Sequence, residues 1–295
     1  MNSKNLLSHK SAGILYMIAA MALFSGMFAL SKLLGQRYSP SQIAFLRFSF
    51  GLIPFLPIIS RRGPSVCHTK RLWGHIWRAF FGLTSLVLQY YALQSLPLAE
   101  GTIAQSTSPM LIALFGVLLL REKPDYSILA SIVLGFVGVV ILSHPQDIKL
   151  DIGLAYALSG AALYALAMIG LRSLGSTENP LTSTIIFSLL STLFTAPPAF
   201  FAWHSIETPD WLLFLGLGLL GGVGQLALTK AYALSTAATV APFSYTSFLW
   251  ATLYGVLIWN QLPDSKTLIG ACFIVTSGIL IRGNHLLKIK GAKKA

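Results

Sequence analysis

Apolar segments of about 20 residues follow one another along almost the whole chain, separated by short segments rich in proline, glycine or charge. A helix needs roughly 20 apolar residues to cross the hydrocarbon core of a bilayer. The pattern therefore predicts an all-α membrane protein. Its ten predicted membrane-spanning helices cover residues 12–34, 40–59, 73–95, 98–120, 126–143, 152–174, 180–202, 210–233, 237–259 and 265–282.

The second half of the chain repeats the pattern of the first half. The segment that begins at Gly13 and the segment that begins at Gly153 share a glycine, a tyrosine and a terminal Leu-Gly in step, and Pro124-Asp125 matches Pro263-Asp264. Each half holds five helices, and an odd number places the second half upside down in the membrane. Such inverted repeats are typical of alternating-access carriers, whose substrate site lies near the midplane between the halves. We therefore expect two inverted five-helix repeats around a central cavity, followed by a basic cytoplasmic tail: residues 12–143, 152–282 and 283–295.

Composition and charge placement support a membrane location. The chain is 55% hydrophobic and 10% charged, whereas soluble domains carry about 25% charged residues. The net charge of +12 comes mostly from short segments between or after apolar runs, where Lys and Arg mark the cytoplasmic side. This placement argues against nucleic acid as a partner and for membrane lipid. It predicts a multi-pass protein of the bacterial inner (plasma) membrane with both termini in the cytoplasm.

Catalytic and metal-binding patterns are absent from the sequence. The two cysteines, Cys67 and Cys272, lie far apart, and the six histidines are scattered. They form neither a disulfide framework nor a metal site. No nucleophile with a base and no paired acids occur within the apolar segments. We expect no enzyme activity, no cofactor and no metal.

Arg47 is an unusual residue because it lies about seven residues into an apolar helix, roughly 10 Å deep at 1.5 Å per residue. An arginine at a helix centre costs about 2.5–3.5 kcal/mol on insertion scales. Its planar guanidinium group could bind a carboxylate or phosphate in the cavity through two hydrogen bonds, or the residue could form a gate. A structural pair, or a side chain that reaches the interface, remains the alternative. Its counterpart in the second repeat is Phe187.

Glu100 is the acidic residue most closely associated with a predicted span. It is a candidate partner of Arg47 in a gate or a candidate proton site, since burial readily neutralises a carboxylate. An exposed carboxylate at a helix N-terminus, stabilised by the helix dipole, is the alternative. Lys32, at the end of the first span, is a weaker ligand candidate. Arg78 is interpreted as an orientation signal near the cytoplasmic surface.

Polar and aromatic residues within the spans complete the candidate site. Amides supply both donors and acceptors, and aromatic rings supply walls, although polar residues also hold helix bundles together through hydrogen bonds. The candidates are Gln89, Gln105, Gln225, Tyr91, Tyr164, Tyr245 and Trp250, and Tyr90 is a further aromatic residue of the predicted wall. Pro109 and Pro242 break hydrogen bonding within their spans, as suits a cavity lining or a hinge. Gly218 and Gly222 predict close helix packing.

The ends of the fourth and ninth spans, "LREKPD" and "NQLPD", together with "SPMLIALFGVLLL", resemble the drug/metabolite transporter superfamily and its EamA-type members. The segment "LSKLLGQRYSPSQIAFLRF" resembles the branch that includes S-adenosylmethionine and riboflavin carriers and opine exporters. The resemblance covers nearly the whole chain and implies a secondary carrier without ATP hydrolysis. Its cavity would be lined mainly by spans 1, 3, 4, 6, 8 and 9. Gln261 stands where the first repeat has Glu122, so one glutamate lacks its repeat partner.

These observations predict a secondary transporter of a small polar organic metabolite, amino-acid-like or related, that works by alternating access, with export as the leading direction. Uptake or exchange of a metabolite such as S-adenosylmethionine is the alternative. A channel or a membrane enzyme is a remote alternative. Protons are a candidate coupling ion, and the sequence leaves both monomer and homodimer open.

Overall fold

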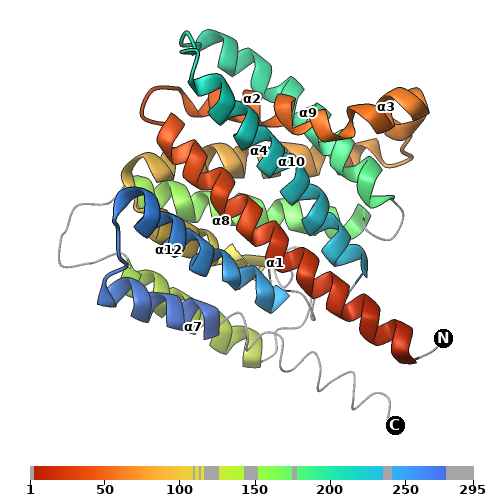
Figure 1. The fold of residues 1–295 in the computed structure, drawn as a ribbon. Coiled ribbons are helices and arrows are strands. Elements are labelled where there is room, and N and C mark those ends of the chain that lie inside the picture. Colours follow the sequence, from red (N-terminus) through yellow and green to blue (C-terminus); the bar gives the residue numbers. More distant parts are fainter. Residues whose placement is uncertain are drawn as a thin grey trace.

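The structure, a computed structural model, describes residues 3–108, 110–112, 114–115, 126–142, 152–174, 178–234 and 241–276. Every regular element in these ranges is a helix (Figure 1). The α-helices are α1 (Ser3–Leu34), α2 (Pro40–Gly51), α3 (Leu56–Arg62), α4 (Leu72–Ser95), α5 (Leu98–Gln105), α7 (Tyr126–Leu142), α8 (Ile152–Leu174), α9 (Pro180–Phe201), α10 (Asp210–Leu234) and α12 (Thr246–Trp259). Short 3₁₀ helices are η1 (Ile53–Phe55), η2 (Gly63–Cys67) and η3 (Ala241–Tyr245), and a further helix covers Ser265–Thr276. The predicted basic tail, 283–295, lies outside the described residues.

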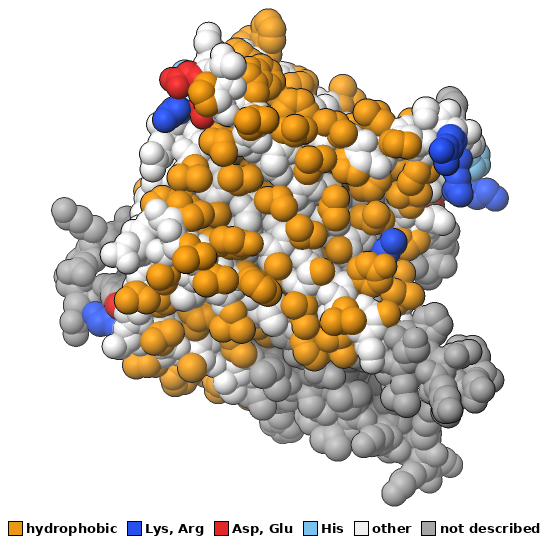
Figure 2. Space-filling view, in the orientation of Figure 1, with side chains coloured by type: hydrophobic (Ala, Val, Ile, Leu, Met, Phe, Trp, Pro, Cys, Tyr) orange, Lys and Arg blue, Asp and Glu red, His pale blue; other side chains and the backbone are white. Residues whose placement is uncertain are grey.

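Long apolar helices confirm the predicted class of all-α membrane protein. Within the described ranges, five segments are long and apolar enough to cross a bilayer: Ser11–Leu34, Pro40–Arg62, Ile152–Leu171, Pro180–Phe201 and Asp210–Leu234. Hydrophobic side chains cover most of the visible face, and most charged ones gather at its edges (Figure 2). Trp73, Phe200 and Phe201 are at least 80% exposed, as expected for side chains that contact lipid.

Three predicted spans are interrupted. The span predicted over 40–59 breaks after Gly51 into α2, η1 and α3, because Pro54 and Pro57 supply no amide hydrogen for a continuous helix. In the fourth span, α5 ends at Gln105, four residues before Pro109. In the ninth span, Pro242 lies in η3 rather than in α12.

Equivalent signals start α2 and α9 in the two repeats. Ser39 caps α2 by accepting a hydrogen bond from the amide of Gln42, and Asn179 caps α9 by accepting one from the amide of Leu181 at 2.9 Å. Proline follows each cap at the first helical position, where its fixed φ suits the helix. The two caps are 140 residues apart, which is also the separation of Gly13 and Gly153.

Helix contacts between the two halves come in equivalent pairs. Helix α1 packs along α10 (Figure 1), and α4 packs along α8; likewise α1 contacts α12, and α5 contacts α8. The counterparts of α1, α4 and α5 in the second repeat are α8, α10 and α12. The contact of α1 with α10 therefore corresponds to that of α8 with α4, and the contact of α1 with α12 corresponds to that of α8 with α5. Helix α2 meets its own counterpart α9, and α5 meets α12. The two repeats are therefore related by a pseudo-two-fold axis, as the sequence predicted.

Close packing of α10 on α2 depends on glycine. A Cβ on Gly218 would lie 2.3 Å from the Cβ of Phe50, and a Cβ on Gly222 would lie 2.3 Å from the carbonyl oxygen of Gly51. Both distances are far below van der Waals contact. The structure thus confirms that the glycines at 218 and 222 allow close helix approach.

The bundle has two ends, which we name by their loops. At the 35–39 end, Gln94 at the end of α4 donates to the carbonyl oxygen of Gly35 at 2.9 Å. At the 63–71 end, Thr69 donates to Glu178, which precedes α9. Loops predicted to share a side of the membrane therefore meet in the structure.

Candidate functional site

Arg47 is buried between α1, α2 and α10 and is 5% exposed. Its Nε donates to Sδ of Met27 at 3.2 Å, and its Cζ lies 4.1 Å from the ring centroid of Phe48. Tyr90 of α4 is near enough to interact with it electrostatically. The phenol oxygen of Tyr90 is buried and has no hydrogen-bond partner. The guanidinium therefore lies in a largely apolar, aromatic environment.

Arg78 of α4 is buried in a similar way and is 3% exposed. Its Nη1 donates to Oγ of Ser183 at 2.6 Å and to the carbonyl oxygen of the same residue at 3.2 Å. Its Cζ lies 4.7 Å from the ring centroid of Phe187, and Tyr164 is its electrostatic neighbour. The side chain is therefore buried against α9 rather than exposed beside the basic loop, and its role as an orientation signal near the cytoplasmic surface stays a prediction.

Two phenylalanine rings connect these arginines. The ring of Phe48 packs edge-on against the ring of Phe187, with centroids 5.6 Å apart. Each ring also lies beneath one guanidinium, in the geometry of a cation–π contact. The order in space is therefore Arg47, Phe48, Phe187, Arg78, which we call the arginine–phenylalanine row.

The row departs from the pseudo-symmetry of the fold. Gly221 contacts Arg47 and Met27, while Gly82, at nearly the same place in the other repeat, contacts Phe187 and Ala167. The environments correspond, but the first repeat supplies a cation and the second an aromatic ring. The structure thus confirms Phe187 as the counterpart of Arg47.

Neither buried arginine forms an ion pair with a described carboxylate. Cation–π contact and a thioether acceptor are weak substitutes for a carboxylate in a low-dielectric interior. The suggested ion pair between Arg47 and Glu100 is also not formed. The carboxylate of Glu100 acts electrostatically on Lys32 instead.

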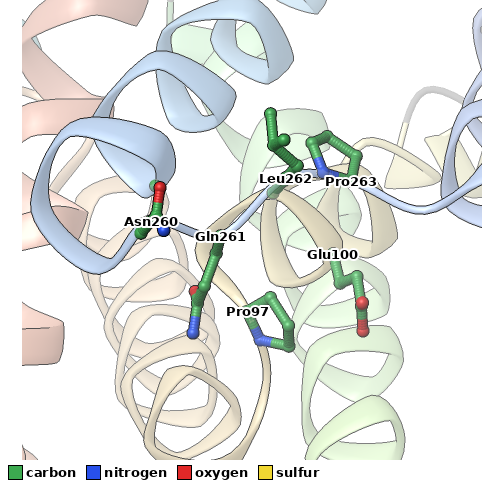
Figure 3. A pocket seen from close by; sticks show the side chains of 8 residues that line it. Pro97, Glu100, Asn260, Gln261, Leu262 and Pro263 are labelled. Carbon is green, nitrogen blue, oxygen red and sulfur yellow. The ribbon is translucent and has the colours of Figure 1, made fainter.

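Glu100 lines a pocket of about 270 Å³ at the 35–39 end (Figure 3). The pocket lies between Pro97 at the start of α5 and the loop Asn260–Pro263 after α12. Near this end, Lys32 joins α1 to the end of α4 by donating to the carbonyl oxygens of Leu93, at 3.2 Å, and Leu96. The role of Glu100 as gate or proton site stays a prediction.

Two of the three amide candidates form hydrogen bonds between helices. Nε2 of Gln89 donates to the carbonyl oxygen of Gly101 at 3.0 Å, and Nε2 of Gln105 contacts Oγ of Ser85 at 3.4 Å. The side-chain oxygen of each glutamine is buried without a partner. Gln225 is 9% exposed on α10. The amides of Gln89 and Gln105 thus join α4 to α5, and their side-chain oxygens could accept a hydrogen bond from a ligand.

The remaining aromatic candidates do not join the row directly. Tyr91 is 39% exposed and packs on Tyr156 with centroids 5.5 Å apart. Trp250 packs against a core formed by α1 and α10, and Tyr245 is half-buried in η3. The buried neighbour of Arg47 is Tyr90 rather than Tyr91, since successive helical residues point about 100° apart.

Each end of the bundle has a polar contact between the repeats. At the 35–39 end, Tyr38 donates to Oδ2 of Asp210 at 2.7 Å, and Arg37 pairs with the same carboxylate at 3.1 Å. At the 63–71 end, Oγ1 of Thr69 donates to Oε1 of Glu178 at 2.8 Å. Position 178 is the repeat counterpart of position 38, so both ends are closed by equivalent loops.

Sequence reasoning missed Arg78, Ser183 and Phe48 as site residues. A usable signal was present for Arg78, which lies six residues into its helix, almost as deep as Arg47. Among the residues searched, no group of three or more His, Cys, Asp or Glu side chains could hold a metal ion.

Comparison with known proteins places the chain in a family. The model of the EamA-like transporter family matches residues 11–144 and again residues 151–283. An S-adenosylmethionine uptake transporter of Rickettsia prowazekii (strain Madrid E) is 25% identical, over 91% of this chain and 92% of the relative. A riboflavin transporter of Vibrio cholerae is 26% identical over 91% of this chain and 92% of the relative. A pseudopaline exporter of Pseudomonas aeruginosa is 25% identical over 92% of this chain and 95% of the relative.

A solved crystal structure has the same fold. It superposes with a TM-score of 0.66 at 20% sequence identity and covers 92% of this chain and 96% of its own. The family model matches most of the chain, once in each repeat. The chain therefore belongs to the EamA-like transporter family.

Proposed function

We propose that this protein is a secondary carrier that exports a small polar organic metabolite with a carboxylate, amino-acid-like or related, across the bacterial inner membrane by alternating access. In this proposal the 63–71 end and both termini face the cytoplasm, and Arg47 binds the carboxylate. The broader statement rests on the family: the protein is a multi-pass membrane transporter of a small molecule, not an enzyme.

The observation that carries the proposal is the burial of Arg47 without a carboxylate partner. A buried cation is strongly destabilising unless it is paired, and among the described residues no acid pairs with it. A planar guanidinium binds a carboxylate through two parallel hydrogen bonds. A substrate acid would therefore complete the site.

Uptake or exchange of S-adenosylmethionine is the second candidate. It is supported by four relatives, each named as an S-adenosylmethionine uptake transporter, that are 25–26% identical to this chain. This metabolite has a carboxylate, so Arg47 would have the same role. Counterflow in vesicles, measured with S-adenosylmethionine on each side, distinguishes exchange from one-way export.

The test uses pairs of compounds that differ by one carboxylate: L-tyrosine and tyramine, L-lysine and cadaverine, S-adenosylmethionine and its decarboxylated form. Thermal unfolding of the purified protein is measured with each compound. A ligand at 100 times its dissociation constant stabilises the native state by about 2.7 kcal/mol. We expect at least one acid to raise the melting temperature while its amine does not.

Variants then assign the effect to Arg47. Loss of a hydrogen bond to a charged group costs about 1.5–3 kcal/mol, so Arg47→Lys, which keeps the charge but loses the fork, should weaken the acid's binding about tenfold or more. The matched control is Lys230→Ala, which removes an exposed cation that lies over Tyr16 on the surface of the bundle. An acid that stabilises Arg47→Lys as well as the parent protein would contradict the proposal.

A further inference from the structure

We propose that Arg78 is a second anion-binding group for the transported substrate, reached from the 63–71 end, while Arg47 serves the 35–39 end. The inference deepens the proposed function and rests on it. It assigns the substrate's acidic group two binding positions, one on each side of the stacked rings of Phe48 and Phe187.

Depth places the two arginines in opposite halves of the bundle. Helix α2 begins at Pro40 at the 35–39 end, so Arg47 lies roughly 10 Å from that end at 1.5 Å per residue. Helix α4 begins at Leu72 at the 63–71 end, so Arg78 lies roughly 9 Å from the other end. A substrate that crosses the bundle would meet one arginine from each side.

The row places both cations along one line of contact. Both guanidinium groups stack on rings that touch each other at 5.6 Å between centroids. The rings belong to α2 and α9, which are each other's counterparts across the pseudo-two-fold axis and are in contact. The row therefore crosses the interface between the repeats, where alternating-access carriers bind substrate.

Arg78 keeps donors available. Its hydrogen bonds to described residues are both donated by Nη1 to Ser183, so Nε and Nη2 can donate to a ligand. No described carboxylate pairs with either arginine, and two buried positive charges favour an anion between the repeats. The competing role is structural: Arg78 would only connect α4 to α9 through Ser183.

Ser183→Cys provides a reporter that leaves Arg78 in place. It is introduced with Cys67→Ser and Cys272→Ala, and membrane vesicles are treated with impermeant methanethiosulfonates that are either anionic (sulfonatoethyl) or cationic (trimethylammonium ethyl). A variant that keeps Cys67 alone identifies the vesicle face formed by the 63–71 end. We expect Ser183→Cys to react from that face and not from the other.

Charge preference then tests the anion site without a substrate. An accessible, positively charged site should accept the anionic reagent faster than the cationic one, and adding Arg78→Ala should lower the anionic-to-cationic rate ratio about tenfold or more. Phe80→Cys is the matched control: it lies two residues after Arg78 on α4 but is 56% exposed on the surface of the bundle. In lipid it should react with neither charged reagent.

Two results would overturn the inference: no reaction of Ser183→Cys from the 63–71 face, or a rate ratio that Arg78→Ala leaves unchanged. Either result assigns Arg78 to a structural contact alone. Both results come from cysteine reactivity and do not depend on the acid and amine pairs that test Arg47. A negative result for Arg78 therefore leaves the proposed function standing. If the acid and amine pairs contradict the role of Arg47, the cysteine measurement on Arg78 can still be interpreted.

Discussion

The guanidinium of Arg47 fits against α10 because residue 221 has no side chain. A Cβ on Gly221 would lie 2.9 Å from Nε of Arg47 and 3.0 Å from Sδ of Met27. Gly221→Ala should displace the guanidinium, weaken binding of the carboxylate member of a compound pair about tenfold, and lower stability by about 1–3 kcal/mol through overpacking. The melting temperature with acid and with amine measures both effects.

Gly216→Ala is the control for this substitution on the same helix. Its nearest contact would be Cδ1 of Leu30 at 3.3 Å, a methyl group at the end of a flexible side chain. It should leave the difference between acid and amine unchanged. Equal loss of acid binding in both alanine variants would mean that α10 packing in general, rather than space for Arg47, controls the site.

Sequence patterns identified Arg47 because a permanent charge stands out within an apolar segment. They did not show that Arg78, whose nearness to a basic loop suggested an orientation signal, is buried against α9, because the direction in which α4 faces follows from its contact with α9. The same limit explains Tyr90 and Tyr91, since their order in the chain does not say which one turns inward. The electrostatic interaction of Glu100 with Lys32 depends on how α5 meets α1, which no local pattern encodes.

Among the helices, α2 and α10 make the closest backbone approach that the glycine positions reveal. Gly222→Ala would place a methyl carbon 2.3 Å from a carbonyl oxygen of α2, and backbone cannot move aside as a side chain can. We expect thermal unfolding to show a loss of stability at the upper end of the 1–3 kcal/mol range for overpacking.

The matched control is Gly26→Ala, whose Cβ would have ordinary contacts of 3.4 Å or more. Replacement of a mid-helix glycine by alanine there should change stability little or raise it, since alanine favours the helix by about 1 kcal/mol. If the two variants unfold at the same temperature, the close approach of α10 to α2 is not a source of stability.

Helix starts were predictable because their causes are local: a polar cap precedes both α2 and α9, and a proline is the first residue of each helix. Interruptions within the predicted helices were harder to predict. Proline at 109 and 242 indicated breaks that the helix boundaries of α5 and α12 bear out. The prolines at 54 and 57 were equally visible, but the apolar character of the segment around them favoured one continuous span.

Across the whole molecule, the repeat predicted from sequence accounts for the paired contacts of α1 with α10 and α4 with α8. The repeat could not predict where symmetry is broken, because Phe187 and Arg47 occupy equivalent places with different chemistry. Among the described residues, the arginine–phenylalanine row packs between the repeats, and a pocket lies at the 35–39 end. Both ends are closed by contacts between repeats.

These closing contacts should have opposite effects on access to the row. Tyr38→Phe removes the hydrogen bond to Asp210 at the 35–39 end, and Thr69→Val removes the hydrogen bond to Glu178 at the 63–71 end. Each bond has a charged acceptor, so its loss should shift the balance between the two open forms by about 1.5 kcal/mol or more, roughly tenfold in population.

Reaction of Ser183→Cys from the 63–71 face measures that balance. Thr69→Val should speed the reaction about tenfold, because it favours the form open at that end. Tyr38→Phe should slow it, because it favours the opposite opening. A rise in both variants would indicate general loosening of the bundle, and no change in either would mean that the loops do not control access. Opposite changes would show that one equilibrium governs both ends, which is the defining property of alternating access.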